Sequence, residues 1–196
     1  MKKKVSIILN VLVVIFEIVG FMISINTNNC ISIEYFTEDS NILALFASSL
    51  YLFFVINKKK IPKWLSILKY IAAVCLTVTF LVVLFILAPM YNFNYYYFLL
   101  YGTMLFHHFI CPIIFVVAFT CFDKVKIVES DKKYGIGTVV LYAIVLIILN
   151  ILKVVDGPYP FLRVLSQPIY ISIFWAVLIL GLAYGISVMI YRLYRR

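Results

Sequence analysis

The sequence predicts an all-α, polytopic membrane protein with six transmembrane helices and both termini in the cytoplasm. Hydrophobic residues make up 65% of the 196 residues and charged residues only 13%, a composition outside the range of soluble domains. The chain also contains repeated apolar runs of about 20 residues, the length that a helix needs to cross a bilayer. Short polar segments separate these runs, and the basic residues gather in every second segment. We therefore expect residues 1–196 to form a single transmembrane domain.

The limits of the apolar runs give the expected spans. Asn10 and Glu17 interrupt the first run, which also lacks a small-residue cleavage site, so we interpret it as an uncleaved helix and not as a signal peptide. The six spans are expected at about 5–25, 41–56, 64–88, 99–122, 135–154 and 169–191.

The net charge of +9 reflects the orientation of the chain and not nucleic-acid binding. All but three of the 17 Lys and Arg residues lie in four clusters on one side of the six-span arrangement. This bias places the basic side in the cytoplasm, where anionic headgroups are sufficient partners. The clusters fall within Lys2–Lys4, Lys58–Lys63, Lys124–Lys133 and Arg192–Arg196. Abundant Lys, Ile, Asn, Tyr and Phe are typical of a low-GC bacterial genome, so we expect a bacterial cytoplasmic membrane.

His107 and His108 are the only histidines, and both lie in the expected fourth span. Ionisable groups at membrane depth are costly and mark candidate functional sites. Adjacent helical residues point about 100° apart, so we expect only one of the two imidazoles to serve a given small site. Two adjacent histidines are poor chelators, and the four cysteines, with Cys30 alone in an outer loop, have no metal-ligand spacing. We expect no metal or other cofactor.

Residue counting predicts that the polar groups gather in the outer half of the bundle. Glu17 falls just beyond the midplane, the histidine pair lies a few residues below the outer boundary, and the second span begins near Thr37. The inner half is expected to hold only hydroxyls, thiols and small residues, apart from Lys69 near the inner interface. This asymmetry favours an enzyme with an outer-leaflet cavity over a carrier, since a carrier needs polar groups along both access routes.

Thr37, in the segment FTEDSN, has two interpretations. It is a plausible N-cap, with Glu38 and Asp39 in the first helical turn. Alternatively it is a nucleophile, which without a free α-amine needs an external base such as an imidazole within about 6 Å. Asn41, one turn later, is then a candidate oxyanion donor.

Two other features also allow two interpretations each. Glu17 either pairs with Lys153 or a histidine as a structural device, or it orients an imidazole. In the outer loop DGPYPFLRV (156–164), Pro158 and Pro160 fix the backbone. The loop is either a rigid connector, the interpretation that we favour, or a segment that folds back over the mouth of the bundle.

The chain resembles a broad group of six-span bacterial integral membrane proteins of unknown function and, more distantly, the animal androgen-induced-gene family. That family carries an aromatic-Leu/Phe-Thr segment at the start of an early span, which is similar to residues 35–37 followed by Asn41. It also carries a histidine four or five residues before a proline, which is similar to His108 or His107 before Pro112. The spacing in the bacterial group favours His108.

The animal proteins are membrane threonine hydrolases of fatty acid esters of hydroxy fatty acids. The resemblance therefore implies a lipid-ester hydrolase or acyltransferase acting on a membrane lipid or lipid-like substrate. The candidate site residues are Thr37 as the nucleophile, His108 or His107 as the base, Asn41 as a donor and Glu17 as an orienting carboxylate. The alternative is a non-catalytic small carrier, or a lipid-binding or accessory membrane protein, that uses the same polar cavity.

Overall fold

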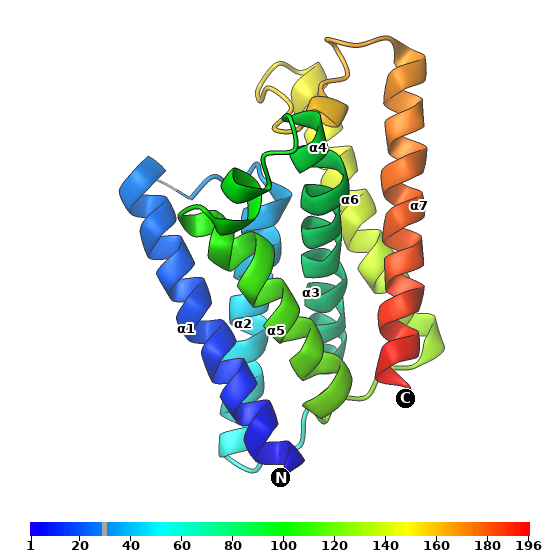
Figure 1. The fold of residues 1–196 in the computed structure, drawn as a ribbon. Helices are drawn as coiled ribbons and strands as arrows, with labels where there is room; N and C mark the ends of the chain where they lie inside the picture. Colours follow the sequence, from blue (N-terminus) through cyan, green and yellow to red (C-terminus); the bar gives the residue numbers. More distant parts are fainter. Residues whose placement is uncertain (29–30) are drawn as a thin grey trace.

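Six long apolar helices form the protein, and over the described residues, 1–28 and 31–196, no strand is present (Figure 1). This computed structural model confirms the all-α fold class and identifies an integral membrane protein. The two termini and the turn between the second and third helices lie at one end of the bundle (Figure 1). The predicted outer-loop cysteine, Cys30, lies outside the described residues. The membrane-crossing helices are Lys2–Thr27, Phe36–Ile56, Lys63–Met90, Leu105–Phe122, Glu129–Ile151 and Ile169–Tyr194.

The regular α-helical parts of these spans are separated by π-helical turns. Helix α3 continues through a π-helical turn at Val83–Leu87 into α4, and α5 is flanked by π-helical turns at Leu105–Ile110 and Ala118–Phe122. The helices are α1 (Lys2–Asn28), α2 (Phe36–Ile56), α3 (Lys63–Val82), α4 (Ala88–Met90), α5 (Cys111–Val117), α6 (Lys132–Ile151) and α7 (Ile169–Tyr194).

Three span starts differ clearly from the prediction, and one of these is the fifth span, which begins at Glu129 and not at 135. Helix α2 begins at Phe36 and not at 41, so Thr37 lies inside the first helical turn. The fourth span begins at Leu105 and not at 99, because the chain is extended at Tyr101 and has a positive φ of 54° at Gly102. Such a left-handed residue ends a helix, and glycine adopts it without steric cost.

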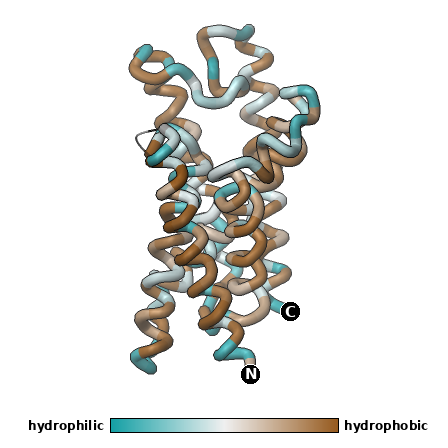
Figure 2. Tube along the Cα trace, turned by 60° about the vertical axis from the view of Figure 1, so that its left-hand side comes forward, coloured by the Kyte–Doolittle hydropathy of each residue, from teal (hydrophilic) through white to brown (hydrophobic). Residues whose placement is uncertain are grey.

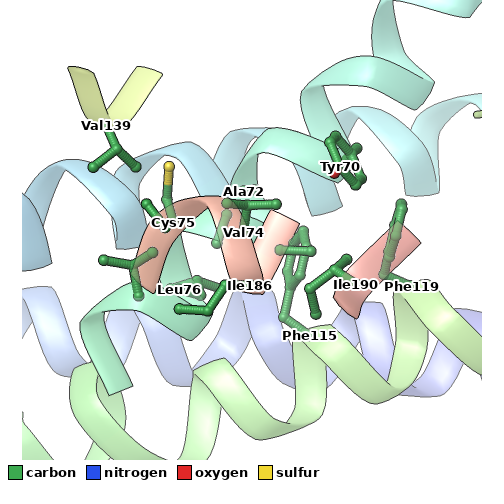
Figure 3. Packing of buried hydrophobic residues seen from close by; sticks show 14 of the residues in the cluster. Tyr70, Ala72, Val74, Cys75, Leu76, Phe115, Phe119, Val139, Ile186 and Ile190 are labelled. Atoms are coloured by element: carbon green, nitrogen blue, oxygen red, sulfur yellow. The ribbon is translucent and has the colours of Figure 1, made fainter. Parts of the chain in front are cut away.

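Helix α3 forms the centre of the bundle and packs against α2, α5, α6 and α7. Figure 3 shows Tyr70 and Val74 of α3 beside Phe115 and Phe119 of the fourth span, with α7 contributing Ile190. The hydropathy colouring shows the same organisation, with hydrophobic residues along the helices and hydrophilic segments at the two ends (Figure 2).

The inner half of the bundle contains a buried ion pair, so the prediction that it holds only hydroxyls, thiols and small residues is wrong. Lys69 Nζ lies 2.7 Å from Asp123 Oδ2, and both side chains are fully buried. Asn10 accepts a hydrogen bond from Lys69 at 2.5 Å and donates one to Asp123 at 2.9 Å. Ser6 donates to Asp123 at 2.7 Å. Residue counting gives the depth of a Cα atom, but it does not show that two long side chains turn inward and meet.

Candidate active site

Thr37 and His108 lie within hydrogen-bond distance of each other near the outer end of the bundle. Thr37 Oγ1 is 3.2 Å from His108 Nε2, at the upper end of the hydrogen-bond range of a nucleophile–base pair. His108 Nδ1 lies 2.7 Å from the Phe98 carbonyl oxygen, which can only accept, so Nδ1 carries the proton. Nε2 of this neutral tautomer is then the acceptor for the Thr37 hydroxyl. Both ring nitrogens of His108 are therefore engaged, and Nε2 is oriented to accept a hydrogen bond from Thr37.

Thr37 does not cap α2, so that interpretation of the threonine is wrong. The cap position is Tyr35, with an extended backbone and no side-chain capping bond. The Thr37 hydroxyl is therefore free to turn toward His108. Its backbone carbonyl accepts hydrogen bonds from Ser40 Oγ at 2.9 Å and Asn41 Nδ2 at 2.7 Å, which fix the first turn. The hydroxyl thus lies beside a helix N-terminus, where backbone dipoles favour negative charge.

Pro112 explains the local geometry around the two histidines. In the π-helical turn Leu105–Ile110 each carbonyl bonds the N–H five residues later, as Phe106 does with Cys111. The next bond in this series would join the His107 carbonyl to residue 112, but proline has no N–H. Asn41 Nδ2 supplies the missing donor at 3.2 Å.

Asn41 therefore links α2 to the turn that carries the candidate base. Its amide group holds the Thr37 carbonyl and the His107 carbonyl together. Both N–H groups of the amide are engaged, so serving as an oxyanion donor would require Asn41 to release one of them. In the structure Asn41 therefore positions Thr37 relative to the histidine-bearing turn. Its role as a hydrogen-bond donor to an oxyanion stays a prediction.

His107 faces a different set of partners from His108. Its Nε2 lies 3.6 Å from Glu17 Oε2, and its Nδ1 lies 3.3 Å from Thr103 Oγ1 and 3.8 Å from Glu38 Oε2. Glu17 is therefore beside a histidine and not beside Lys153. The carboxylate does not orient His108, because the Phe98 carbonyl does so.

Gly20 makes room for the His107 ring against α1. A Cβ atom at this position would lie 2.4 Å from His107 Nε2. The imidazole also packs on Phe21, with ring centroids 4.6 Å apart. The two imidazole rings thus lie in separate environments, as the angle of about 100° between adjacent helical residues predicts.

An apolar pocket opens next to Thr37. Its cavity volume is about 50 Å³. Threonine hydroxyls apart, its walls are hydrocarbon and aromatic side chains of α3, α6, α7 and the loop that follows α6. They include Val78, Val82, Leu87, Val139, Phe161 and Ile179. A pocket with this lining favours an apolar group over a charged one.

Tyr159 belongs to this site, although it was not among the predicted site residues and was noted only as part of the outer loop. It is buried, lines the pocket with Thr37, and its ring stacks on Phe161 at 5.1 Å. The Tyr159 hydroxyl faces both the hydroxyl and the backbone N–H of Thr37. Burial raises the pKa of Tyr159 to about 12, against the opposing effect of its hydrogen bonds with the side chain and the backbone N–H of Thr37, so the phenol stays protonated at neutral pH.

Asn150 fixes the loop that carries Tyr159. Asn150 Nδ2 donates to the Val155 carbonyl at 3.2 Å, and Asn150 Oδ1 accepts from the Val164 N–H at 3.0 Å. The loop folds back into the mouth of the bundle, so the interpretation as a mere connector is wrong. The feature of the sequence that points to this fold-back is Tyr159, an aromatic residue between Pro158 and Pro160.

Comparison with known proteins adds no relative. No family model matches the chain, no curated protein matches it, and no solved structure is significantly similar. The functional proposal therefore rests on the chemistry of the described side chains.

Proposed function

We propose that the protein hydrolyses or transfers acyl groups of lipid esters, with Thr37 as the nucleophile and His108 as the general base. The observation that carries the proposal is the 3.2 Å contact between Thr37 Oγ1 and His108 Nε2 at the wall of an apolar pocket. A threonine hydroxyl is a weak nucleophile, and an adjacent base with its own orienting partner activates it. The Phe98 carbonyl is that partner.

The reaction proceeds in two steps. His108 Nε2 takes the hydroxyl proton as Thr37 Oγ1 attacks the ester carbonyl carbon, and the proton then passes to the leaving alcohol as the acyl-Thr37 ester forms. In the second step water, or a second alcohol, attacks the acyl carbon while His108 again accepts the proton. Thr37 is released with its proton restored, and the product is a carboxylic acid or a new ester.

Negative charge develops on the carbonyl oxygen in both steps and needs preorganised donors. The Tyr159 hydroxyl and the N-terminal backbone of α2 are the groups available beside Thr37. We assign Asn41 to positioning, because both of its N–H groups hold backbone carbonyls. Glu17 contacts His107 and takes no part in these steps.

The proposed substrate is a membrane lipid or a lipid-like ester whose acyl chain enters the apolar pocket. The basic clusters and the common end of the two termini (Figure 1) support a cytoplasmic location for that end. The site then opens toward the outer leaflet of what we propose is a bacterial cytoplasmic membrane.

A non-catalytic carrier or lipid-binding protein is the second candidate. The buried Lys69–Asp123 pair supports it, because polar groups then occur in both halves of the bundle. The asymmetry that favoured an enzyme is correspondingly weaker.

Labelling of the purified protein with a lipophilic fluorophosphonate, together with hydrolysis of a fluorogenic fatty acid ester, tests the proposal. We expect Thr37→Ala to abolish labelling and His108→Gln to lower the hydrolysis rate by about 10²–10⁴-fold. Thr138→Ala is the matched control, since the described partner of its hydroxyl is the Tyr134 carbonyl within the same helix. Full activity in both site variants excludes the catalytic pair. Acyl-ligand binding that is unchanged in a protein without turnover favours the second candidate.

A further inference from the structure

A second buried group of ionisable side chains lies beside the candidate active site, formed by Glu17, Glu38 and His107. The side chain of Glu17 is fully buried, and that of His107 is 1% exposed. Both Glu17 oxygens, Glu38 Oε2 and His107 Nε2 are buried and make no hydrogen bond to a nitrogen or oxygen atom of the described residues. Buried polar atoms are rarely left in this state, so four of them in one place need an explanation.

The imidazole of His107 joins the two carboxyl groups through its two nitrogens. Nε2 faces Glu17 Oε2 of α1 at 3.6 Å, and Nδ1 faces Glu38 Oε2 of α2 at 3.8 Å. Ser24 donates to the other oxygen of Glu38 at 3.3 Å. Because the carboxyl groups lie on opposite nitrogens of one ring, the arrangement suits a chain of proton donors and acceptors.

The negative charge of the two carboxyl groups also needs to be neutralised. No Lys or Arg within the described residues forms an ion pair with Glu17 or Glu38; their ionisable partner is His107, which carries charge only when it is protonated. With all three groups deprotonated, two negative charges would stand in an apolar interior, which is costly. Water could satisfy hydrogen bonds there but could not remove this charge, whereas bound protons do both.

We propose that Glu17, His107 and Glu38 form a buried proton-binding site. Once the ring closes the gaps of 3.6 and 3.8 Å to the two carboxyl groups, Nε2 accepts a proton from Glu17 while Nδ1 releases its proton to the Glu38 carboxylate. One proton is then transferred, and the ring stays neutral but is left in its other tautomer. The other titratable groups that face the site are Cys111 beside Glu17, Asp39 beside Glu38, and His108. The side chains of these three residues make no described contact with the Thr37 side chain, although Glu38 and His107 are the chain neighbours of Thr37 and His108.

Vibrational and NMR spectroscopy of the reconstituted full-length protein test the site without a substrate. At pH 7 we expect either a protonated-carboxyl infrared band or an imidazolium ¹⁵N signal from His107. Because the chain has only two histidines, His108→Gln assigns the remaining imidazole signal to His107. Wild-type protein alone is sufficient for this first measurement, so it does not depend on the folding of a variant.

The isosteric variants Glu17→Gln and Glu38→Gln then locate the proton. We expect at least one of them to remove the signal, and the exposed-loop variant Asp156→Asn to retain it. The proposal is overturned if wild-type protein at pH 7 has ionised carboxylates and a neutral His107, or if neither glutamine variant changes the signal. These spectra can be interpreted even if the protein does not hydrolyse esters, because no substrate is added.

Discussion

Asn41 on α2 donates a hydrogen bond to the backbone carbonyl of His107 at 3.2 Å. The carbonyl is available because Pro112 has no N–H to give it. The same amide holds the Thr37 carbonyl at 2.7 Å. The Asn41 side chain therefore holds Thr37 and the turn that carries His108 in a fixed relative position, in addition to the direct contact between Thr37 and His108.

Asn41→Leu is expected to destabilise the protein and misalign the pair. The Thr37 carbonyl keeps its bond from Ser40 Oγ, but the buried His107 carbonyl loses its side-chain donor, at a cost of about 1–3 kcal/mol for a group left unsatisfied. The free energy of unfolding in an SDS titration measures the loss. The matched control is Asn57→Leu, because Asn57 makes a similar bond to the Phe53 carbonyl at 2.7 Å but is exposed. An equal effect of the two substitutions would contradict the positioning role.

The buried ion pair of the inner half gives a second stability prediction. Asp123→Ala leaves the Lys69 ammonium group without its counter-charge, and breaking such a pair costs about 3–5 kcal/mol. The double variant Lys69→Met/Asp123→Leu removes both charges and is expected to recover much of this loss. Unfolding followed by tryptophan fluorescence gives both values. If the double variant is no more stable than Asp123→Ala, the pair is not the source of the effect.

Gly20 provides a third test, on the packing of His107 against α1. In Gly20→Ala the new Cβ lies 2.4 Å from His107 Nε2, so the ring or the helix must move. Overpacking of this kind costs about 1–3 kcal/mol, and the His107 ¹⁵N shift is expected to change with it. Gly137→Ala is the control, because no atom lies within 4 Å of its added Cβ. There the substitution is expected to be neutral or stabilising, since alanine favours a helix.

The number of spans could be predicted because crossing length and charge bias are properties of single segments. The start of α2 was placed late because the polar residues of FTEDSN lower the local hydropathy, although Ser40 and Asn41 turn inward and are buried. A hydropathy pattern measures the polarity of a residue and not the direction of its side chain.

The candidate pair could be proposed from sequence because both members are distinctive residues in short motifs. The partner of His108 could not, since a backbone carbonyl such as that of Phe98 has no sequence signature. Tyr159 was equally out of reach, because its contact with Thr37 depends on how a loop more than a hundred residues away folds into the bundle. Long-range packing decides such contacts.

Tyr159→Phe tests the oxyanion donor without disturbing the pocket. The ring is retained against Phe161, so stability is expected to change little, whereas the hydroxyl that faces Thr37 is lost. Removal of one oxyanion donor lowers kcat by about 10²–10³-fold, and KM is expected to change far less. Tyr170→Phe is the control, because Tyr170 is exposed on α7.

The pH dependence separates a donor from a base at Tyr159. Burial raises the pKa of Tyr159 to about 12, so the phenol keeps its proton, and its ability to donate, at every lower pH. Ester hydrolysis by the wild type should therefore show no loss attributable to Tyr159 between pH 7 and about 10. A rate that rises with ionisation of Tyr159 in this range, and no longer rises in Tyr159→Phe, would show that the phenolate acts as a base and would contradict the donor role. A ratio of wild-type to Tyr159→Phe rates that stays constant over the range supports it, since only a group that keeps one protonation state gives a constant ratio.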